Sequence, residues 1–241
     1  MPSDKTVPAR RDFLRRSLAL LPVTALAGYG VGTGQALADT PATVSGQTPR
    51  AYMPSFFSPE EWAFLGASVA RLIPADERGP GALEAGVPEY IDRQMGTPYA
   101  SGNQWYMRGP FQPDAPATMG YQLQLAPRDV YRLGIGDAEA YSRNQHGKPF
   151  AELDAGTQDK LLGAFERGEA QFEHVPSRLL FALLLSNTRE GFFCDPMYGG
   201  NQGMVGWTLI GFPGARADFM DWVERDERYP FPPVSIRGER A

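Results

Sequence analysis

The sequence is poor in the side chains that most catalytic and metal sites need. Among its 241 residues there is one cysteine, Cys194, and there are two histidines, His146 and His174. A single thiol can neither form an internal disulfide nor supply a four-cysteine zinc or iron–sulfur site. Cys194 is therefore buried, bonded to another chain or free, and burial is the usual state of an unpaired cysteine.

Motifs of the common enzyme classes are also missing. Neither histidine neighbours a nucleophile motif such as G-x-S-x-G, and there is no Walker phosphate loop and no C-x-x-C-H haem-attachment motif. The glycines of residues 30–34 follow no predicted strand and lack the spacing of a dinucleotide-binding turn. A cluster of acidic residues near the C-terminus has the spacing of a solvated helix face. We therefore expect this chain to contain no catalytic, cofactor-binding or metal-binding residues.

The first 38 residues have the pattern of an export signal. A twin-arginine pair is followed by Phe-Leu, by a modest apolar stretch over 17–31 and by a small-x-small cleavage pattern. The paired arginines favour the Tat route, and a membrane anchor is disfavoured because Pro22, Gly28 and Gly30 interrupt the apolar stretch. The pattern predicts a cleaved Tat signal peptide and a periplasmic protein. The residues that carry it are Arg10, Arg11, Phe13, Leu14, Ala36 and Ala38.

Composition predicts one domain and excludes nucleic acid as a partner. The formal net charge is −5, and because residues 1–38 contribute +3, the remaining residues carry −8. Hydrophobic residues make up 42% of the chain, which is enough for a core. The 27 glycines and 22 prolines predict short regular elements joined by long connections.

Apolar residues recur at helical spacing in several segments, and no segment alternates as a strand does. Ser58, Pro59 and Glu61 form a capping box with proline in the first turn, which predicts a helix that ends before Pro74. Further helices are expected over 83–95, 129–144, 154–169, 177–193 and 215–225, with an aperiodic loop over 96–127. We expect a mainly α fold: a flexible arm over 39–54, then a single small helical domain over 55–241 with long irregular loops and an extended C-terminal tail.

The most distinctive segment lies near the C-terminus. Residues 193–201 read Phe-Cys-Asp-Pro-Met-Tyr-Gly-Gly-Asn, and they are followed by Gly206-Trp207 and by Gly-Phe-Pro-Gly at 211–214. Together with Leu72-Ile73-Pro74, this motif resembles the gluconate 2-dehydrogenase subunit 3 family. The resemblance implies a non-catalytic small subunit of a membrane-bound FAD-dependent dehydrogenase that oxidises D-gluconate to 2-keto-D-gluconate. It also implies two partners, a large subunit that holds FAD and a multihaem cytochrome c subunit that passes electrons to quinone.

The resemblance also accounts for a mismatch in the sequence. The Tat system exports folded proteins, usually with their cofactor inserted, yet this chain has no evident cofactor motif. We therefore expect it to escort the FAD-loaded subunit to the outer face of the inner membrane, where the cytochrome subunit provides membrane association. A related complex that oxidises fructose, sorbitol or glucose, a stand-alone carbohydrate-binding protein and a stand-alone enzyme with a carboxylate site remain alternatives.

The expected partner interface combines two segments. One is the motif within residues 193–214, which we call the tail motif, and the other is the aperiodic loop over 96–127, which we call the aromatic loop. Buried aromatic anchors carry much of the binding energy in protein interfaces, and both segments are rich in aromatic residues. The predicted interface residues are Trp105, Tyr106, Phe111, Asp195, Tyr198, Gly199, Gly200, Asn201 and Trp207.

Overall fold

The computed structural model describes residues 52–241, so the predicted signal peptide and residues 39–51 of the predicted arm lie outside the described part. Within residues 52–241 the regular elements are α-helices and short 3₁₀ segments, with isolated β-bridges but no strand. The mainly α fold class is thus confirmed. The α-helices are α2 (Pro59–Leu72), α3 (Val87–Gln94), α4 (Pro127–His146), α5 (Ala155–Arg167), α6 (Ser177–Phe193) and α7 (Val205–Ile210).

Helix α2 begins as its sequence predicts. The Ser58 hydroxyl accepts a hydrogen bond from the Glu61 amide at 3.3 Å, and the Glu61 carboxylate accepts one from the Ser58 amide at 2.8 Å. Pro59 occupies the first turn, where its missing amide hydrogen costs nothing. The capping box and the proline together define the start of the helix.

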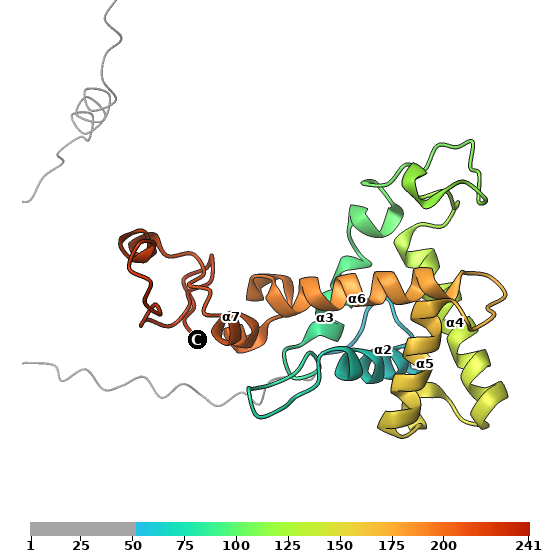
Figure 1. The fold of residues 1–241 in the computed structure, drawn as a ribbon, viewed down its shortest axis with the longest axis horizontal. Coiled ribbons are helices and arrows are strands. Elements are labelled where there is room, and N and C mark those ends of the chain that lie inside the picture. The colour runs from blue at the N-terminus through green and yellow to red at the C-terminus, as the bar shows by residue number, and fades with distance from the viewer. Residues whose placement is uncertain (1–51) are drawn as a thin grey trace, which may run out of the picture. The chain divides into compact units, whose positions relative to one another are not determined.

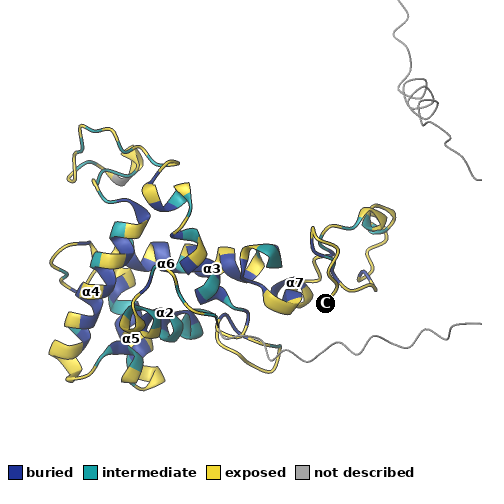
Figure 2. Ribbon diagram, turned by 180° about the vertical axis from the view of Figure 1, so that it is seen from behind, coloured by how far each residue is buried: buried dark blue, intermediate teal, exposed yellow. Residues whose placement is uncertain are grey.

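Helix α6 is the centre of the domain and has the bounds that its apolar run predicts. It contacts α2, α3, α4 and α5, so it crosses the middle of the helical body (Figure 1). The buried residues are concentrated where these helices face one another (Figure 2). The largest fully buried side chains are Tyr131, Phe64, Phe150, Phe165, Phe192, Leu65, Ile91, Ile135, Leu180 and Leu184.

The C-terminal region differs from the prediction. The helix expected over 215–225 is wrong, since only the 3₁₀ segment η7 (Ala217–Trp222) forms there. The sequence pattern also missed α7, which spans six residues between Met204 and Gly211. A helix this short has little stability of its own, so its formation depends on the contacts described below.

The start of the domain is fixed by a buried carboxylate on α3. Asp92 is fully buried and accepts hydrogen bonds from the Tyr52 hydroxyl at 2.7 Å and from the Ser55 amide and hydroxyl at 2.8 Å each. It also accepts bonds from the amides of Phe56 at 2.9 Å and Phe57 at 3.1 Å. Tyr52 therefore belongs with the domain, slightly earlier than the predicted boundary at residue 55.

None of the helices in the described part is long and apolar enough to cross a membrane.

Candidate partner-binding site

The tail motif forms a tight turn between α6 and α7, and Asn201 lies at its centre. Asn201 is fully buried and adopts a left-handed backbone conformation with φ of 46°. Its side-chain nitrogen donates to the Cys194 carbonyl at 2.8 Å, and its side-chain oxygen accepts from the Gly206 amide at 2.8 Å. The asparagine thus joins the end of α6 to the start of α7.

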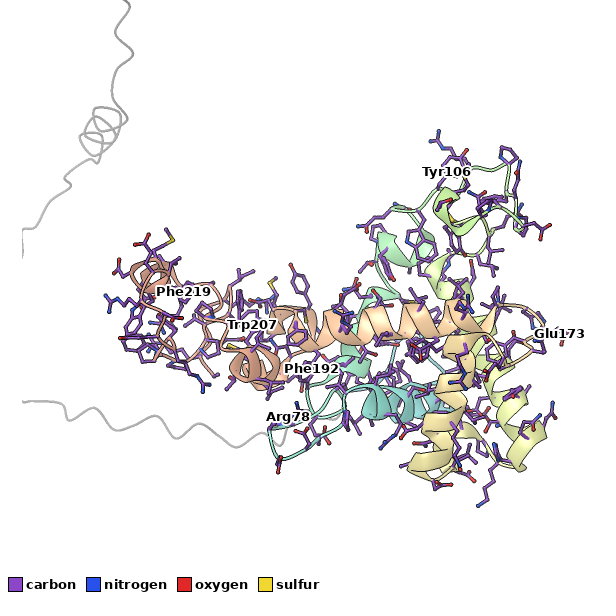
Figure 3. The ribbon with its side chains drawn as sticks, viewed as in Figure 1. Arg78, Tyr106, Glu173, Phe192, Trp207 and Phe219 are labelled. Atoms are coloured by element: carbon purple, nitrogen blue, oxygen red, sulfur yellow. The ribbon has the colours of Figure 1, made fainter. Side chains whose placement is uncertain are left out.

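Trp207 completes this junction. Its indole nitrogen donates to the Phe193 carbonyl at 2.7 Å, and only 6% of its surface is exposed. Figure 3 shows Trp207 and Phe192 together at this end of α6. A Cβ atom on Gly206 would lie 2.1 Å from the Phe192 carbonyl oxygen, so glycine allows the two helix ends to approach closely.

Asp195 ties the C-terminal tail to the same junction. One carboxylate oxygen accepts from the Met197 amide at 3.1 Å and caps the 3₁₀ segment η5 (Pro196–Tyr198). The other accepts from the Ile236 amide at 2.7 Å, 41 residues further along the chain. The Ala215 amide donates to the Val234 carbonyl at 2.8 Å and closes the tail back on itself.

These contacts show what the predicted motif residues do within the chain. Five of the predicted interface residues are buried and engaged internally, so they position the surrounding surface instead of forming it. Tyr198 differs, because 47% of its surface is exposed. The five buried residues are Asp195, Gly199, Gly200, Asn201 and Trp207.

The surface that the motif positions is apolar and belongs to α7 and the tail. Leu209, Ile210, Phe212 and Phe231 are 46%, 59%, 46% and 49% exposed, and we call these four residues the α7 surface. Phe212 packs edge-on against Trp207 with ring centroids 5.2 Å apart, which links this surface to the buried anchor. The prediction missed Leu209, Ile210 and Phe212, although the absence of charge over 205–214 is a usable signal.

Two clefts flank the α7 surface. A cleft of about 800 Å³ lies between α7 and the end of α2, and apolar residues such as Leu72, Phe192 and Leu209 line it together with the charged Asp76 and Arg78. A smaller cleft of about 380 Å³ is lined by Trp207, Phe231 and the prolines of the tail. Thr208 and Arg228 line both clefts, so α7 forms the ridge between them.

The aromatic loop lies elsewhere on the domain. Trp105 packs against Tyr121 with ring centroids 4.5 Å apart, Tyr106 is 59% exposed and Phe111 is half-buried. The loop and the outer side of α6 enclose a groove of about 720 Å³, which we call the α6 groove. Tyr106 and Trp207 lie well apart in Figure 3. The structure therefore divides the predicted interface into two regions.

The family model for gluconate 2-dehydrogenase subunit 3 matches residues 59–214. The chain belongs to the gluconate 2-dehydrogenase subunit 3 family. The match begins at the first residue of α2 and ends at Gly214, so it includes the aromatic loop, the motif and α7. Searches of the curated proteins and of the solved structures found no match. The family name describes one subunit of an oxidoreductase complex, and other subunits are therefore implied.

Cys194 and His174 of this subunit have identifiable structural surroundings. The Cys194 thiol is half-buried, it donates to the Gly191 carbonyl at 3.4 Å, and burial raises its pKa to about 11. His174 Nδ1 lies 2.8 Å from the Asp137 carboxylate, which also accepts the amides of His174 and Val175, so this pair fastens the loop before α6 to α4. Residues 52–241 contain no group of three or more His, Cys, Asp or Glu placed to hold a metal ion.

Proposed function

We propose that this protein is the non-catalytic small subunit of an FAD-dependent dehydrogenase complex of the gluconate 2-dehydrogenase type. Its role is to bind the flavoprotein subunit through the α7 surface and to bring that subunit to the periplasm. The observation that carries the proposal is the pairing of an exposed apolar surface with a buried motif that holds it. The FAD and the haem c groups are expected on the other subunits, and gluconate is the expected substrate of the complex.

The energetics of the α7 surface favour a protein partner. Four large apolar side chains are each about half exposed, and burying a full side chain of this kind contributes about 1.5–3 kcal/mol. Burying the exposed halves would therefore contribute on the order of 3–6 kcal/mol to association. Surfaces with uncharged cores and aromatic residues are typical of protein interfaces, and residues 205–214 carry no charge.

The anchoring contacts lower the cost of binding. Asn201 and Trp207 join the end of α6 to α7, and Asp195 joins this junction to the tail 41 residues further on, so contacts within the chain already order α7 and the tail. A preorganised surface loses less conformational entropy on association than a flexible one. Asn201, Asp195 and Trp207, which are buried, thus support binding without touching the partner.

The export role rests on the predicted twin-arginine signal of residues 1–38. A small subunit that binds a folded, FAD-loaded partner would carry it through the Tat system. The cytochrome c subunit would then receive electrons from the flavoprotein and pass them to quinone at the membrane. This division of roles accounts for an export signal on a chain without a recognisable cofactor motif.

Substitution on the α7 surface tests the binding role. We expect the double variant Leu209→Asp, Ile210→Asp to weaken binding to the co-expressed flavoprotein by about 100-fold or more, equivalent to about 3 kcal/mol. Leu83→Asp is the control for placing an aspartate at an exposed leucine, because Leu83 is 47% exposed but lies outside the α7 surface and both clefts. Co-purification, flavin content and thermal unfolding would be measured for each. A double variant that folds and still co-purifies like the wild type would show that the flavoprotein binds elsewhere.

A further inference from the structure

The second region of interest is the α6 groove. Its floor is a single stripe of α6, formed by residues 179, 182, 183, 186 and 190, which recur at helical spacing. Its opposite wall is the aromatic loop, with Trp105, Tyr106 and Tyr121. Figure 1 shows this loop arching over α6, on the side away from α2 and α5. The groove is thus separate from the α7 surface, which lies beyond the C-terminal end of α6.

Glu190 is the one charged residue that lines the groove in the described part of the chain. Its carboxylate accepts hydrogen bonds from the Ser186 hydroxyl at 2.9 Å, the Asn187 side-chain nitrogen at 3.0 Å and the Tyr90 hydroxyl at 3.4 Å. All three donors are neutral, and Glu190 is in none of the ion pairs within residues 52–241. The carboxylate is therefore oriented by the fold but not neutralised by it.

The remaining lining favours an apolar ligand over a hydroxylated one. The Tyr106 hydroxyl donates to the Gly109 carbonyl at 2.8 Å, and the Tyr121 hydroxyl donates to the Leu125 carbonyl. The Gln122 side chain is bonded to the backbone of Met119 and Gln112. With these polar groups already paired, few are left to bind the hydroxyls of a sugar or polyol.

The loop itself has the composition of an interface. Residues 96–126 include Trp, Tyr, Phe and Met side chains but only two charged ones, Arg108 and Asp114, and neither lines the groove. Interface cores are depleted in charge and enriched in aromatic residues and methionine. A segment that fills the groove should therefore be apolar and carry one cationic side chain, because that cation would pair with the Glu190 carboxylate.

We propose that the α6 groove binds an apolar segment of the flavoprotein subunit that presents one lysine or arginine to Glu190. This inference rests on the proposed function, since it requires that the flavoprotein is the partner. It adds a second contact, on a different face from the α7 surface. Two contacts on one chain raise the effective concentration of the second after the first has formed.

Cross-linking in the intact complex locates the occupant. A photo-cross-linking amino acid would replace Tyr106 in one variant of the full chain and Leu209 in another, each co-expressed with the flavoprotein and cytochrome subunits. We expect the probe at 106 to capture a flavoprotein peptide that contains a lysine or arginine among apolar residues. If the probe at 209 captures the flavoprotein while the probe at 106 captures nothing or captures the cytochrome, the groove proposal fails and the proposed function stands. If neither captures the flavoprotein, both fail.

Charge substitution tests the role of Glu190 separately. We expect Glu190→Lys to weaken binding of the flavoprotein at least about tenfold and Glu190→Gln to weaken it less, because the first places like charges together. Glu166→Lys, at an exposed position of α5, makes the same change in charge away from the groove and should bind like the wild type. Thermal unfolding would confirm that each variant is folded. A folded Glu190→Lys variant that binds as tightly as the wild type would overturn the assignment of Glu190.

Discussion

Substitutions of Asn201 test whether the turn between α6 and α7 holds the α7 surface in place. Asn201→Gly removes both side-chain hydrogen bonds but accepts the left-handed backbone, since φ there is 46°. The Cys194 carbonyl and the Gly206 amide would lose their partner. Each unsatisfied buried polar group costs about 1–3 kcal/mol, so the expected destabilisation of the turn is about 2–5 kcal/mol.

The alanine variant separates the backbone contribution from the hydrogen bonds. Asn201→Ala loses the same two bonds and also places a Cβ in the left-handed region, which costs roughly 1–2 kcal/mol more. We therefore expect the order of stability wild type, Asn201→Gly, Asn201→Ala. Because domains are stable by only about 5–15 kcal/mol, both variants should open α7 measurably.

Hydrogen exchange over residues 202–212, together with urea unfolding of the mature chain, measures these effects. Exchange should accelerate in this segment, while the amides of α6 and α2 keep more of their protection. The variants should also bind the flavoprotein more weakly, although Asn201 is buried. An Asn201→Gly variant with unchanged exchange and unfolding, or an Asn201→Ala variant more stable than Asn201→Gly, would contradict this role of Asn201.

Three further predictions concern the packing and the pH dependence of the domain. Asp92→Ala should destabilise the domain by about 3–5 kcal/mol, because the amides of Ser55, Phe56 and Phe57 lose their acceptor; unchanged urea unfolding would contradict this. Burial alone would raise the pKa of Asp92, but the hydrogen bonds from Ser55, Tyr52, Phe56 and Phe57 outweigh burial and lower that pKa. The stabilisation by Asp92 should therefore persist above the unfolded pKa of about 4 and disappear in stronger acid. Gly206→Ala should cost about 1–3 kcal/mol in thermal unfolding, because the added Cβ would meet the Phe192 carbonyl. Gly136→Ala should instead stabilise α4 by about 0.5–1 kcal/mol, because beyond its chain neighbours and the α4 backbone no atom lies within 4 Å of the added Cβ. Equal effects of the two substitutions would show that the close approach at Gly206 is unimportant. The Asp137 carboxylate raises the pKa of His174. This pair should therefore stabilise the domain below about pH 6.5 and lose that contribution as pH rises through the raised pKa. An Asp137→Asn variant whose stability has the same pH profile as the wild type would contradict the role of the pair.

The sequence predicts those helices whose start or buried face is set by residues close together in the chain. The capping box of Ser58 and Glu61 and the apolar run of α6 act within a few residues, so the bounds of α2 and α6 could be predicted closely. Asp154 likewise caps α5 by accepting the Thr157 amide at 3.1 Å. Such signals do not depend on the tertiary structure.

The missed features depend on contacts between distant residues. Helix α7 has six residues, and it is held by the bond from Trp207 to the Phe193 carbonyl, 14 residues earlier, together with the bond from the Gly206 amide to Asn201 within the turn. The five bonds to Asp92 come from residues 35 to 40 positions earlier, and no local pattern indicates them. The motif was recognisable, but only the fold shows that its most distinctive residues face inward.

Following the flavoprotein across the membrane tests the escort role of this subunit. Arg10→Lys with Arg11→Lys would be introduced in the small subunit while the flavoprotein carries a tag, and both compartments would be assayed for tag, FAD and dye-linked gluconate oxidation. Arg15→Lys with Arg16→Lys serves as the control, because it makes the same change outside the predicted pair. We expect tagged flavoprotein and activity to remain in the cytoplasm for the first variant alone. Flavoprotein that still reaches the periplasm in that variant would contradict the escort role.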